Sequence, residues 1–350
     1  MPEKVLNMKP YDPTEDIYRI KLDANESPFD PPAALKQKIE RAVSSAAFNR
    51  YPDPKCGDLR SKAAAFFGVT QNQVVAGNGS DELIALILGS LCKKGARLML
   101  LAPDFSMYGI YAGLNELEVF TVCKGSDMKI SVDRIIEEAK KIRPDLIMFS
   151  NPCNPTGQGI GKSEMLRLAS NSDALMIIDE AYMDFFNESV LPDAANLDNV
   201  IVLRTASKAF GFASIRLGFA VGNEYLISQL QKSRSPFNVN AMTQAAAGVI
   251  LSEPEYLKDC AKKIISLKNE LEDMLIGIFC DYPELICLIK TVTNFTVVKT
   301  DFAGRIYSEL LKRSICVRRF DGFLRITAGK EQENRELVKS LADILKSLED

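Results

Sequence analysis

Short apolar runs alternate with longer amphipathic segments from about residue 74 onward. The apolar runs lie at 98–102, 117–122, 146–150, 175–179, 200–204 and 218–222. Such continuous runs are typical of strands that are buried on both faces, and apolar residues at helical spacing occupy 131–142 and 162–171 between them. The alternation predicts an α/β fold with a mostly parallel, doubly wound sheet.

The pattern changes near residue 251. Apolar residues at helical spacing over 252–275 predict a helix that is long enough to connect two bodies. Strand-like runs follow at 286–290, 294–299, 315–319 and 323–327, with helical segments around 301–312 and 332–348. Because 350 residues exceed the size at which a single core keeps growing, we expect a large domain and a small α+β domain.

Composition removes several classes of function. Lys and Arg number 43 against 46 acidic residues, so no overall positive field would attract nucleic acid or an anionic membrane. The opening segment carries charges and prolines where a signal peptide needs an apolar block, and the longest apolar stretch, 83–91, is too short to span a bilayer. We expect a cytoplasmic protein that does not contact membranes.

The spacing of the cysteines and the lack of histidine argue against a metal site. The eight cysteines contain no C-x-x-C pair and the chain has no histidine, so the usual zinc-binding sets are missing. We interpret the cysteines as reduced thiols that lie mostly in the core.

Polar residues follow three consecutive apolar runs. The run at 146–150 is followed by NPCNPTG, the run at 175–179 ends in Asp179 with Tyr182 three residues later, and the run at 200–204 is followed by Lys208 and Arg216. Each has a structural explanation by itself, as a proline-rich turn, a helix cap or a solvated edge charge. Together they lie at the carboxyl edge of the predicted sheet, where open parallel sheets bind ligands, and they predict a site.

A fourth segment, VVAGNGSDELIALIL, leads from a short strand through Gly77, Gly79 and Ser80 into an apolar helix. The exposed N–H groups and the positive dipole end of a helix favour an anion there, although Ser80 could equally be an ordinary helix cap. The loop matches neither a Walker loop nor G-x-G-x-x-G, so nucleoside triphosphate and dinucleotide binding lose support.

Lys208 and Arg216 have no acidic residue near them in the sequence. A partly desolvated lysine beside a second cation loses its proton more readily and can form a Schiff base with a carbonyl compound. Pyridoxal phosphate is the cofactor that requires a lysine, a carboxylate and a phosphate site together. In this hypothesis Asp179 keeps the pyridine nitrogen protonated, and Arg216 has the phosphate as its partner in place of a protein carboxylate.

The motifs LDANESPFDPP, RYPDP, NPCNPTGQ, IIDEAYMDF, LRTASKAFGFASIRLGF and LRITAG resemble those of the class I/II aminotransferases of pyridoxal phosphate fold type I. The resemblance extends from about Lys9 to Thr327, and within the family it is greatest to members that act on histidinol phosphate. It implies a large three-layer α/β/α domain, 47–261, with a mostly parallel seven-stranded sheet. Residues 1–46 and 262–350 would form the small α+β domain.

The resemblance also assigns roles to residues. Lys208 would form the Schiff base and carry the proton between the substrate Cα and the cofactor, while Asp179 pairs with the pyridine nitrogen. The remaining cofactor contacts would be Asn154 and Tyr182 at the phenolic oxygen, Ser80, Asp81, Thr205, Ser207 and Arg216 at the phosphate, and Phe105 stacked on the ring where the family commonly has tyrosine. Tyr51 would reach the cofactor phosphate of a neighbouring subunit, which implies a homodimer with shared active sites.

For the substrate, Arg325 matches the arginine that binds the carboxylate, a task that suits a planar, bidentate guanidinium. Asn154 is also expected to contact the substrate. Tyr11 and Arg318 match contacts to the distal phosphate of histidinol phosphate, with Arg319 as a second candidate, and Asn238 or Asn240 could touch the substrate.

The reaction implied is transamination between histidinol phosphate and 2-oxoglutarate, which yields glutamate. An aromatic amino acid aminotransferase and a threonine-phosphate decarboxylase share several of these motifs and remain alternatives. So does a non-catalytic binding protein, which would normally lack the lysine or carry an added DNA-binding domain.

Overall fold

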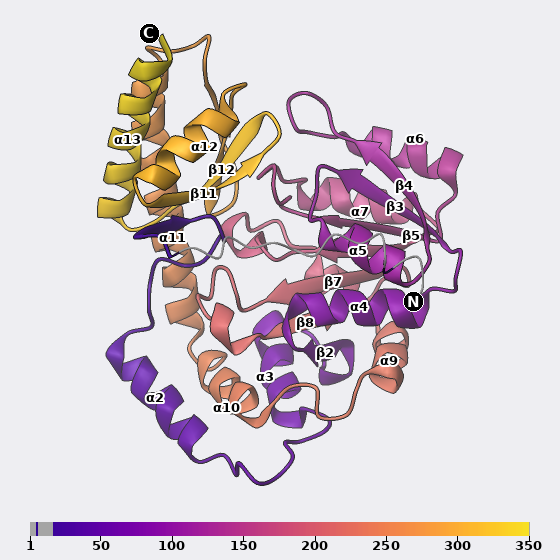
Figure 1. Ribbon diagram of the computed structural model, residues 1–350. Helices are drawn as coiled ribbons and strands as arrows, with labels where there is room; N and C mark the ends of the chain where they lie inside the picture. The colour runs from indigo at the N-terminus through magenta and orange to yellow at the C-terminus, as the bar shows by residue number, and fades with distance from the viewer. Residues whose placement is uncertain (1–4, 6–16, 350) are drawn as a thin grey trace.

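The computed structural model describes Val5 and residues 17–349, which are arranged around two β-sheets (Figure 1). The larger sheet contains β2 (Val74–Gly77), β3 (Arg97–Ala102), β4 (Glu118–Cys123), β5 (Leu146–Ser150), β6 (Leu175–Asp179), β7 (Val200–Thr205) and β8 (Gly218–Val221). Their order is β2-β8-β7-β6-β5-β3-β4, and every strand except β8 runs in the same direction. The predicted mostly parallel seven-stranded sheet is therefore confirmed.

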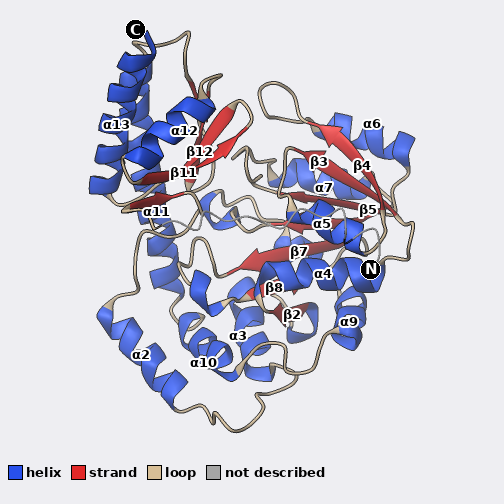
Figure 2. Ribbon diagram, viewed as in Figure 1, coloured by secondary structure: helices blue, strands red, loops and turns tan. Residues whose placement is uncertain are grey.

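Helices cover both faces of this sheet and produce three layers (Figure 2). One face carries α4 (Gly79–Leu91), α5 (Met107–Leu114) and α9 (Glu224–Ser233), and the other carries α3 (Gly57–Phe67), α6 (Val132–Ile142), α7 (Lys162–Ser170) and α10 (Ala241–Ile250). Successive strand residues point to opposite faces, so Ile177 packs in one layer and Ile178 in the other. Burial on both sides explains why most of these strands read as continuous apolar runs.

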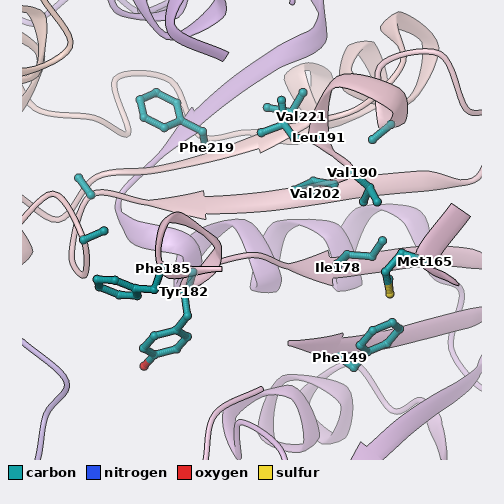
Figure 3. Packing of buried hydrophobic residues seen from close by; sticks show 14 of the residues in the cluster. Phe149, Met165, Ile178, Tyr182, Phe185, Val190, Leu191, Val202, Phe219 and Val221 are labelled. Atoms are coloured by element: carbon teal, nitrogen blue, oxygen red, sulfur yellow. The ribbon is translucent and has the colours of Figure 1, made fainter. Parts of the chain in front are cut away.

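Further helical elements complete the large body. They are α2 (Ala33–Ser44), α8 (Leu191–Ala194) and the single-turn 3₁₀ helices η1 (Gln71–Gln73), η2 (Met183–Phe185) and η3 (Ala213–Ile215). η2 follows β6 directly, and Figure 3 shows Tyr182 at this end of the strand with its hydroxyl oxygen directed away from Ile178 and the packed interior. The carboxyl end of β6 thus changes from apolar packing to a polar surface.

The strand β4 corrects one expectation. We predicted that the run at 117–122 would be buried on both faces, but most side chains of β4 are partly or fully exposed and only Val122 is buried. The reason is its position at the edge of the sheet, where it pairs with β3 alone. Its apolar residues reflect strand propensity more than burial.

The smaller sheet contains β1 (Ile20–Leu22), β9 (Cys287–Ile289), β10 (Phe295–Lys299), β11 (Ile315–Phe320) and β12 (Phe323–Thr327), in the order β1-β11-β12-β10-β9. β1 is parallel to β11, and the other neighbours are antiparallel. The helices α12 (Ala303–Lys312) and α13 (Glu331–Glu349) pack against one face (Figure 1). The predicted small α+β layer is confirmed, but β1 was not predicted as a strand, although residues 1–46 were assigned to the small domain.

The helix α11 (Pro254–Phe279) connects the two cores over 26 residues. Leu257 packs in the core of the large sheet, and Leu271 packs in the core of the small one. This agrees with the expected bridging helix. The residue boundaries of the two domains stay a prediction, and α2, which they assign to the small domain, packs Leu35 into the core of the large sheet.

All eight cysteines lie in the described residues and carry free thiols. Cys123, Cys280 and Cys287 are exposed, so the expectation of mostly core thiols holds for only part of the set. Within residues 17–349 no helix has both the length and the apolar character needed to cross a membrane.

Candidate active site

A cavity of about 520 Å³ lies where the carboxyl ends of the large-sheet strands meet one face of the small sheet. Most of the residues singled out from the sequence line it: Ser80, Asp81, Phe105, Asn154, Asp179, Tyr182, Thr205, Ser207, Lys208, Arg216, Arg318 and Arg325. They come from segments separated by almost 250 positions, so their convergence supports the prediction that the strand ends form one site.

Other candidates lie elsewhere. Tyr51 is 81% exposed and stacks on Phe237 with 4.5 Å between ring centroids. Asn238 donates to Glu82 at 2.9 Å, and Asn240 accepts from the backbone N–H of Thr243 as the N-cap of α10, so both have local structural roles outside the cavity lining.

The two neighbouring arginines of β11 face different surroundings. Arg318 lines the cavity, whereas the guanidinium of Arg319 packs over the ring of Tyr307 at 5.6 Å. Alternation along the strand explains the difference, and it favours Arg318 as the ligand-facing residue. The predicted contact Tyr11 lies outside the described residues.

Lys208 is half-buried in the loop that follows β7. Its Nζ donates to the backbone oxygen of Ala24 at 2.9 Å. Burial lowers the pKa of Lys208 to about 8, and the positive charges of Arg325 and then Arg216 act in the same direction. The sequence had suggested Arg216 as the activating cation, and the structure makes Arg325 the larger influence of the two.

Asp179 is the last residue of β6 and is only 4% exposed. Its carboxylate accepts hydrogen bonds from the Tyr108 hydroxyl at 2.8 Å and from the Ala181 N–H at 3.1 Å. Burial raises the pKa of Asp179 to about 7, since these two bonds only partly offset the loss of water. A buried carboxyl group of this kind suits a cationic partner at the cavity side.

Tyr108 was not identified from the sequence. It is 1% exposed, and its ring meets that of Phe105 edge to face at 5.5 Å. The spacing of the two aromatic residues in PDFSMY, three apart at the start of a helix, was the available signal, because such a pair shares one helical face.

The beginning of α4, the loop after β7 and Arg216 form an anion cradle. The Arg216 guanidinium donates to the Ser207 hydroxyl at 3.4 Å, and the backbone of Gly218 approaches the Gly79–Ser80 peptide so closely that a Cβ at 218 would lie 2.5 Å from the Ser80 nitrogen. The N–H groups at the helix start and the guanidinium together favour a phosphate.

One expectation about Arg216 was wrong. We predicted that it has no protein carboxylate as a partner, but its Nη2 lies 3.3 Å from Asp81 Oδ2. Both side chains are about half exposed, and ion pairs of this type contribute little to stability. A phosphate group could therefore compete for Arg216 at small cost.

Tyr182 and Asn154 connect the two sheets. The Tyr182 hydroxyl accepts from the Asn25 side-chain amide at 2.7 Å, and the Asn154 side-chain oxygen accepts from Arg325. Burial raises the pKa of Tyr182 to about 12, so the hydroxyl keeps its proton at neutral pH. Asn25 belongs to the LDANES motif but was not singled out.

A buried ion pair supports the NPCNPTG loop from behind. Lys124 Nζ lies 3.5 Å from Asp104 Oδ2, and both side chains are at most 5% exposed. Asp104 also bonds the Ser150 hydroxyl, which in turn accepts from the Asn154 N–H at 3.0 Å. Sequence reasoning missed these residues because their partners are distant in the chain.

The donor set fits pyridoxal phosphate. Lys208 offers an amine with a lowered pKa, Asp179 offers a buried carboxyl group, and the anion cradle offers a phosphate site, all in one cavity. Pyridoxal phosphate is the cofactor that needs these three features together.

The fold and the cavity are those of a pyridoxal phosphate-dependent transferase, and residues 18–341 match the family Aminotransferase class I and II. The chain belongs to this family, whose members are pyridoxal phosphate-dependent enzymes acting on small molecules. It is similar to the histidinol-phosphate aminotransferase of Clostridium novyi, with 35% identity over 342 residues that cover 96% of this chain and 95% of that protein.

Two further comparisons agree. The histidinol-phosphate aminotransferase of Pyrococcus furiosus is 36% identical over 347 residues, which cover 98% of this chain and 97% of that protein. The solved structure of the Sinorhizobium meliloti histidinol-phosphate aminotransferase in complex with pyridoxal-5'-phosphate superimposes with a TM-score of 0.87 at 22% identity, covering 95% of this chain and 92% of that one. The predicted aminotransferase fold and family are confirmed.

Proposed function

We propose that the protein transfers the amino group of histidinol phosphate to 2-oxoglutarate, which yields glutamate and the corresponding oxo compound, or catalyses the reverse reaction. The similarity over nearly the whole chain to histidinol-phosphate aminotransferases supports this substrate. The observation that carries the proposal is that Lys208, Asp179 and the anion cradle share one cavity with two further arginines, Arg318 and Arg325.

When bound, pyridoxal phosphate supplies an aldehyde for the amino group and a ring that stabilises negative charge at the substrate Cα. Lys208 Nζ would bind that aldehyde and later take up and return the Cα proton, a task that its lowered pKa supports. Asp179 would hold a proton on the ring nitrogen by ion pairing. Tyr182 and Asn154 would bind the phenolic oxygen.

The cofactor phosphate would lie in the anion cradle. Ser80, Thr205 and Ser207 would donate hydroxyl groups, Ser80 and Asp81 their N–H groups, and Arg216 its guanidinium, while Phe105 would stack on the ring. Phe105 and Thr205 line the same cavity, which supports these roles.

Arg318 and Arg325 would bind the anionic end of the substrates. They are directly opposite each other on β11 and β12, and both line the cavity. Two adjacent guanidinium groups can bind a phosphate dianion or a carboxylate, so one pair could accept both histidinol phosphate and glutamate in turn.

We also propose that two copies associate with shared active sites. Support comes from Phe48 and Tyr51, which are 71% and 81% exposed, because large aromatic side chains in one exposed segment are typical of interfaces. A cytoplasmic location is proposed as well, and the free thiols of all eight cysteines are consistent with a reducing compartment.

The test is the visible spectrum of the cofactor-loaded protein. Histidinol phosphate should shift the absorption band, and 2-oxoglutarate should restore it, while a Lys208→Ala protein should not show the cycle. Release of carbon dioxide from threonine phosphate would instead indicate a decarboxylase. Equal activity on aromatic amino acids and on histidinol phosphate would indicate an aromatic aminotransferase.

A further inference from the structure

The Tyr108 hydroxyl lies against the carboxylate that ends β6. It donates to Asp179 Oδ2 at 2.8 Å, and the two residues are only 1% and 4% exposed. Both residues also line the cavity. Because water competes little for a buried hydrogen bond, and because a carboxylate is a stronger acceptor than a neutral oxygen, this contact has a large influence on the charge of Asp179.

Two hydrogen bonds from described residues reach the Asp179 carboxylate. One comes from the backbone N–H of Ala181 at 3.1 Å, and the other comes from Tyr108. The first belongs to the turn after β6 and does not depend on the side chain at position 181. The second depends on a single hydroxyl group. Among residues 17–349, Tyr108 is therefore the one side chain that stabilises the charge of Asp179 by a hydrogen bond.

The other surroundings of Asp179 act against its negative charge. Burial raises the pKa of Asp179 to about 7, and the charges of Asp104, in the loop after β3, and Asp81, on α4, act in the same direction. Tyr182, which follows β6, keeps its own proton because burial raises its pKa to about 12. Burial and then the charge of Asp179 hold the pKa of Tyr108 well above its usual value. Tyr108 therefore remains a hydrogen-bond donor near neutral pH.

In the function proposed above, the pyridine nitrogen of the cofactor would lie at Asp179. A proton between that nitrogen and the carboxylate has two positions, N–H⁺···⁻O and N···H–O, and its transfer changes no other bond. A donor to the carboxylate favours the first arrangement, because it bonds a charged oxygen more strongly than a neutral one. We propose, resting on that function, that Tyr108 is a positioning residue whose hydroxyl, acting through Asp179, keeps this proton on the ring nitrogen.

The test variant is Tyr108→Phe. It retains the ring, which meets Phe105 edge to face with 5.5 Å between centroids, and removes only the hydroxyl. The variant should fold, because Asp179 can take up a proton when it loses this donor, and its melting temperature checks this. Tyr111→Phe is the matched control. Tyr111 lies three residues further along α5 and lines the same cavity, but the charge that raises its pKa, after burial, is that of Asp81.

Two NMR measurements locate the proton without depending on turnover. In the cofactor-free protein with carbon-13 at its aspartate carboxyl groups, Tyr108→Phe should raise the pKa of Asp179 by about one to two units, the effect of losing one hydrogen bond to a charged group. The Asp179 resonance is the one that is missing in Asp179→Asn.

The second measurement uses the holoenzyme loaded with pyridoxal phosphate that carries nitrogen-15 in its ring. At pH 7 the wild-type resonance should be that of a protonated nitrogen, and in Tyr108→Phe it should move toward that of neutral pyridine. Tyr111→Phe should match the wild type in both NMR measurements. Because a less protonated ring stabilises negative charge at the substrate Cα less well, Tyr108→Phe should also lower kcat about tenfold with little change in KM.

The outcomes separate the two proposals. If the visible spectrum of the wild type does not respond to histidinol phosphate, the proposed function fails, while the two NMR measurements still test Tyr108. The role of Tyr108 is overturned if Tyr108→Phe leaves either the Asp179 titration or the ring-nitrogen resonance at its wild-type value, or if Tyr111→Phe moves them as much. Changes in both measurements that are confined to Tyr108→Phe support it.

Discussion

The lowered pKa of Lys208 leads to a quantitative prediction. With the ordinary lysine pKa of 10.5, about one amine in three thousand is neutral at pH 7, whereas a pKa of about 8 leaves about one in eleven neutral. Only the neutral amine attacks an aldehyde, so the cofactor-free protein should capture pyridoxal phosphate roughly 300 times faster than an ordinary lysine would. Replacing Arg325 removes a charge that lowers this pKa, and Arg325→Gln should therefore slow the capture at pH 7.

The assay is the rate of covalent capture as a function of pH, followed by visible absorbance and by borohydride fixation to the chain. Below pH 8 the wild-type rate should rise about tenfold per pH unit, and above that it should level off. In Arg325→Gln the levelling should move to higher pH. Arg318→Gln is the matched control, because Arg318 lines the same cavity but is not among the main charges that shift the pKa of Lys208.

Pyridoxal without its phosphate gives a second check, since its capture does not depend on the anion cradle and isolates the amine. The reasoning is refuted if the wild-type rate keeps rising past pH 10. It is also refuted if Arg325→Gln and Arg318→Gln have the same inflection as the wild type.

Three further predictions concern stability. In the cofactor-free protein, the folded state keeps the Asp179 proton up to about pH 7 while the unfolded chain loses it near 3.8, so stability falls as pH rises between these values. Asp179→Asn should accordingly raise the free energy of unfolding by up to about 4 kcal/mol at pH 8 and by much less at pH 5, as measured by urea unfolding. An equal effect at the two pH values would contradict the raised pKa of Asp179. Gly218→Ala should lower the melting temperature and weaken pyridoxal phosphate binding at least tenfold by equilibrium dialysis, because its Cβ would overlap the start of α4. Gly113→Ala, which has open space around its Cβ, is the control and should do neither. Lys268→Met breaks a buried ion pair and should cost about 3–5 kcal/mol in urea unfolding, while Lys258→Met, on the exposed side of the same helix, should cost under about 1 kcal/mol; equal costs would show that burial does not matter here.

The sequence contained enough to predict both sheets and the main parts of the site, for a physical reason. Parallel strands buried on both faces produce recognisable apolar runs, and their carboxyl ends meet at one edge, so Asp179 and Lys208 could be placed together without coordinates. The glycines before α4 similarly marked a helix start that can bind an anion.

The missed residues depend on contacts between distant segments. Tyr108 acquires its role only because α5 brings it to Asp179, and Asn25, in the segment that follows β1, bonds Tyr182 from 157 positions away. The edge position of β4 is likewise a property of strand order, which hydrophobic periodicity does not encode. The carboxylate partner of Arg216 was missed for the same reason, since Asp81 is 135 positions away.

The pairing of β1 with β11 has a consequence for synthesis on the ribosome. Arg19 and Ser314, which bond each other beside this pair, are separated by 295 positions, so the strand that emerges among the first must wait until nearly the whole polypeptide has been translated. The segments 74–221 of the large sheet can assemble during that interval, as domains generally do when they fold in order of emergence. If translation stopped before β11, the nascent chain could form the loop that carries Lys208 but would lack Arg318 and Arg325.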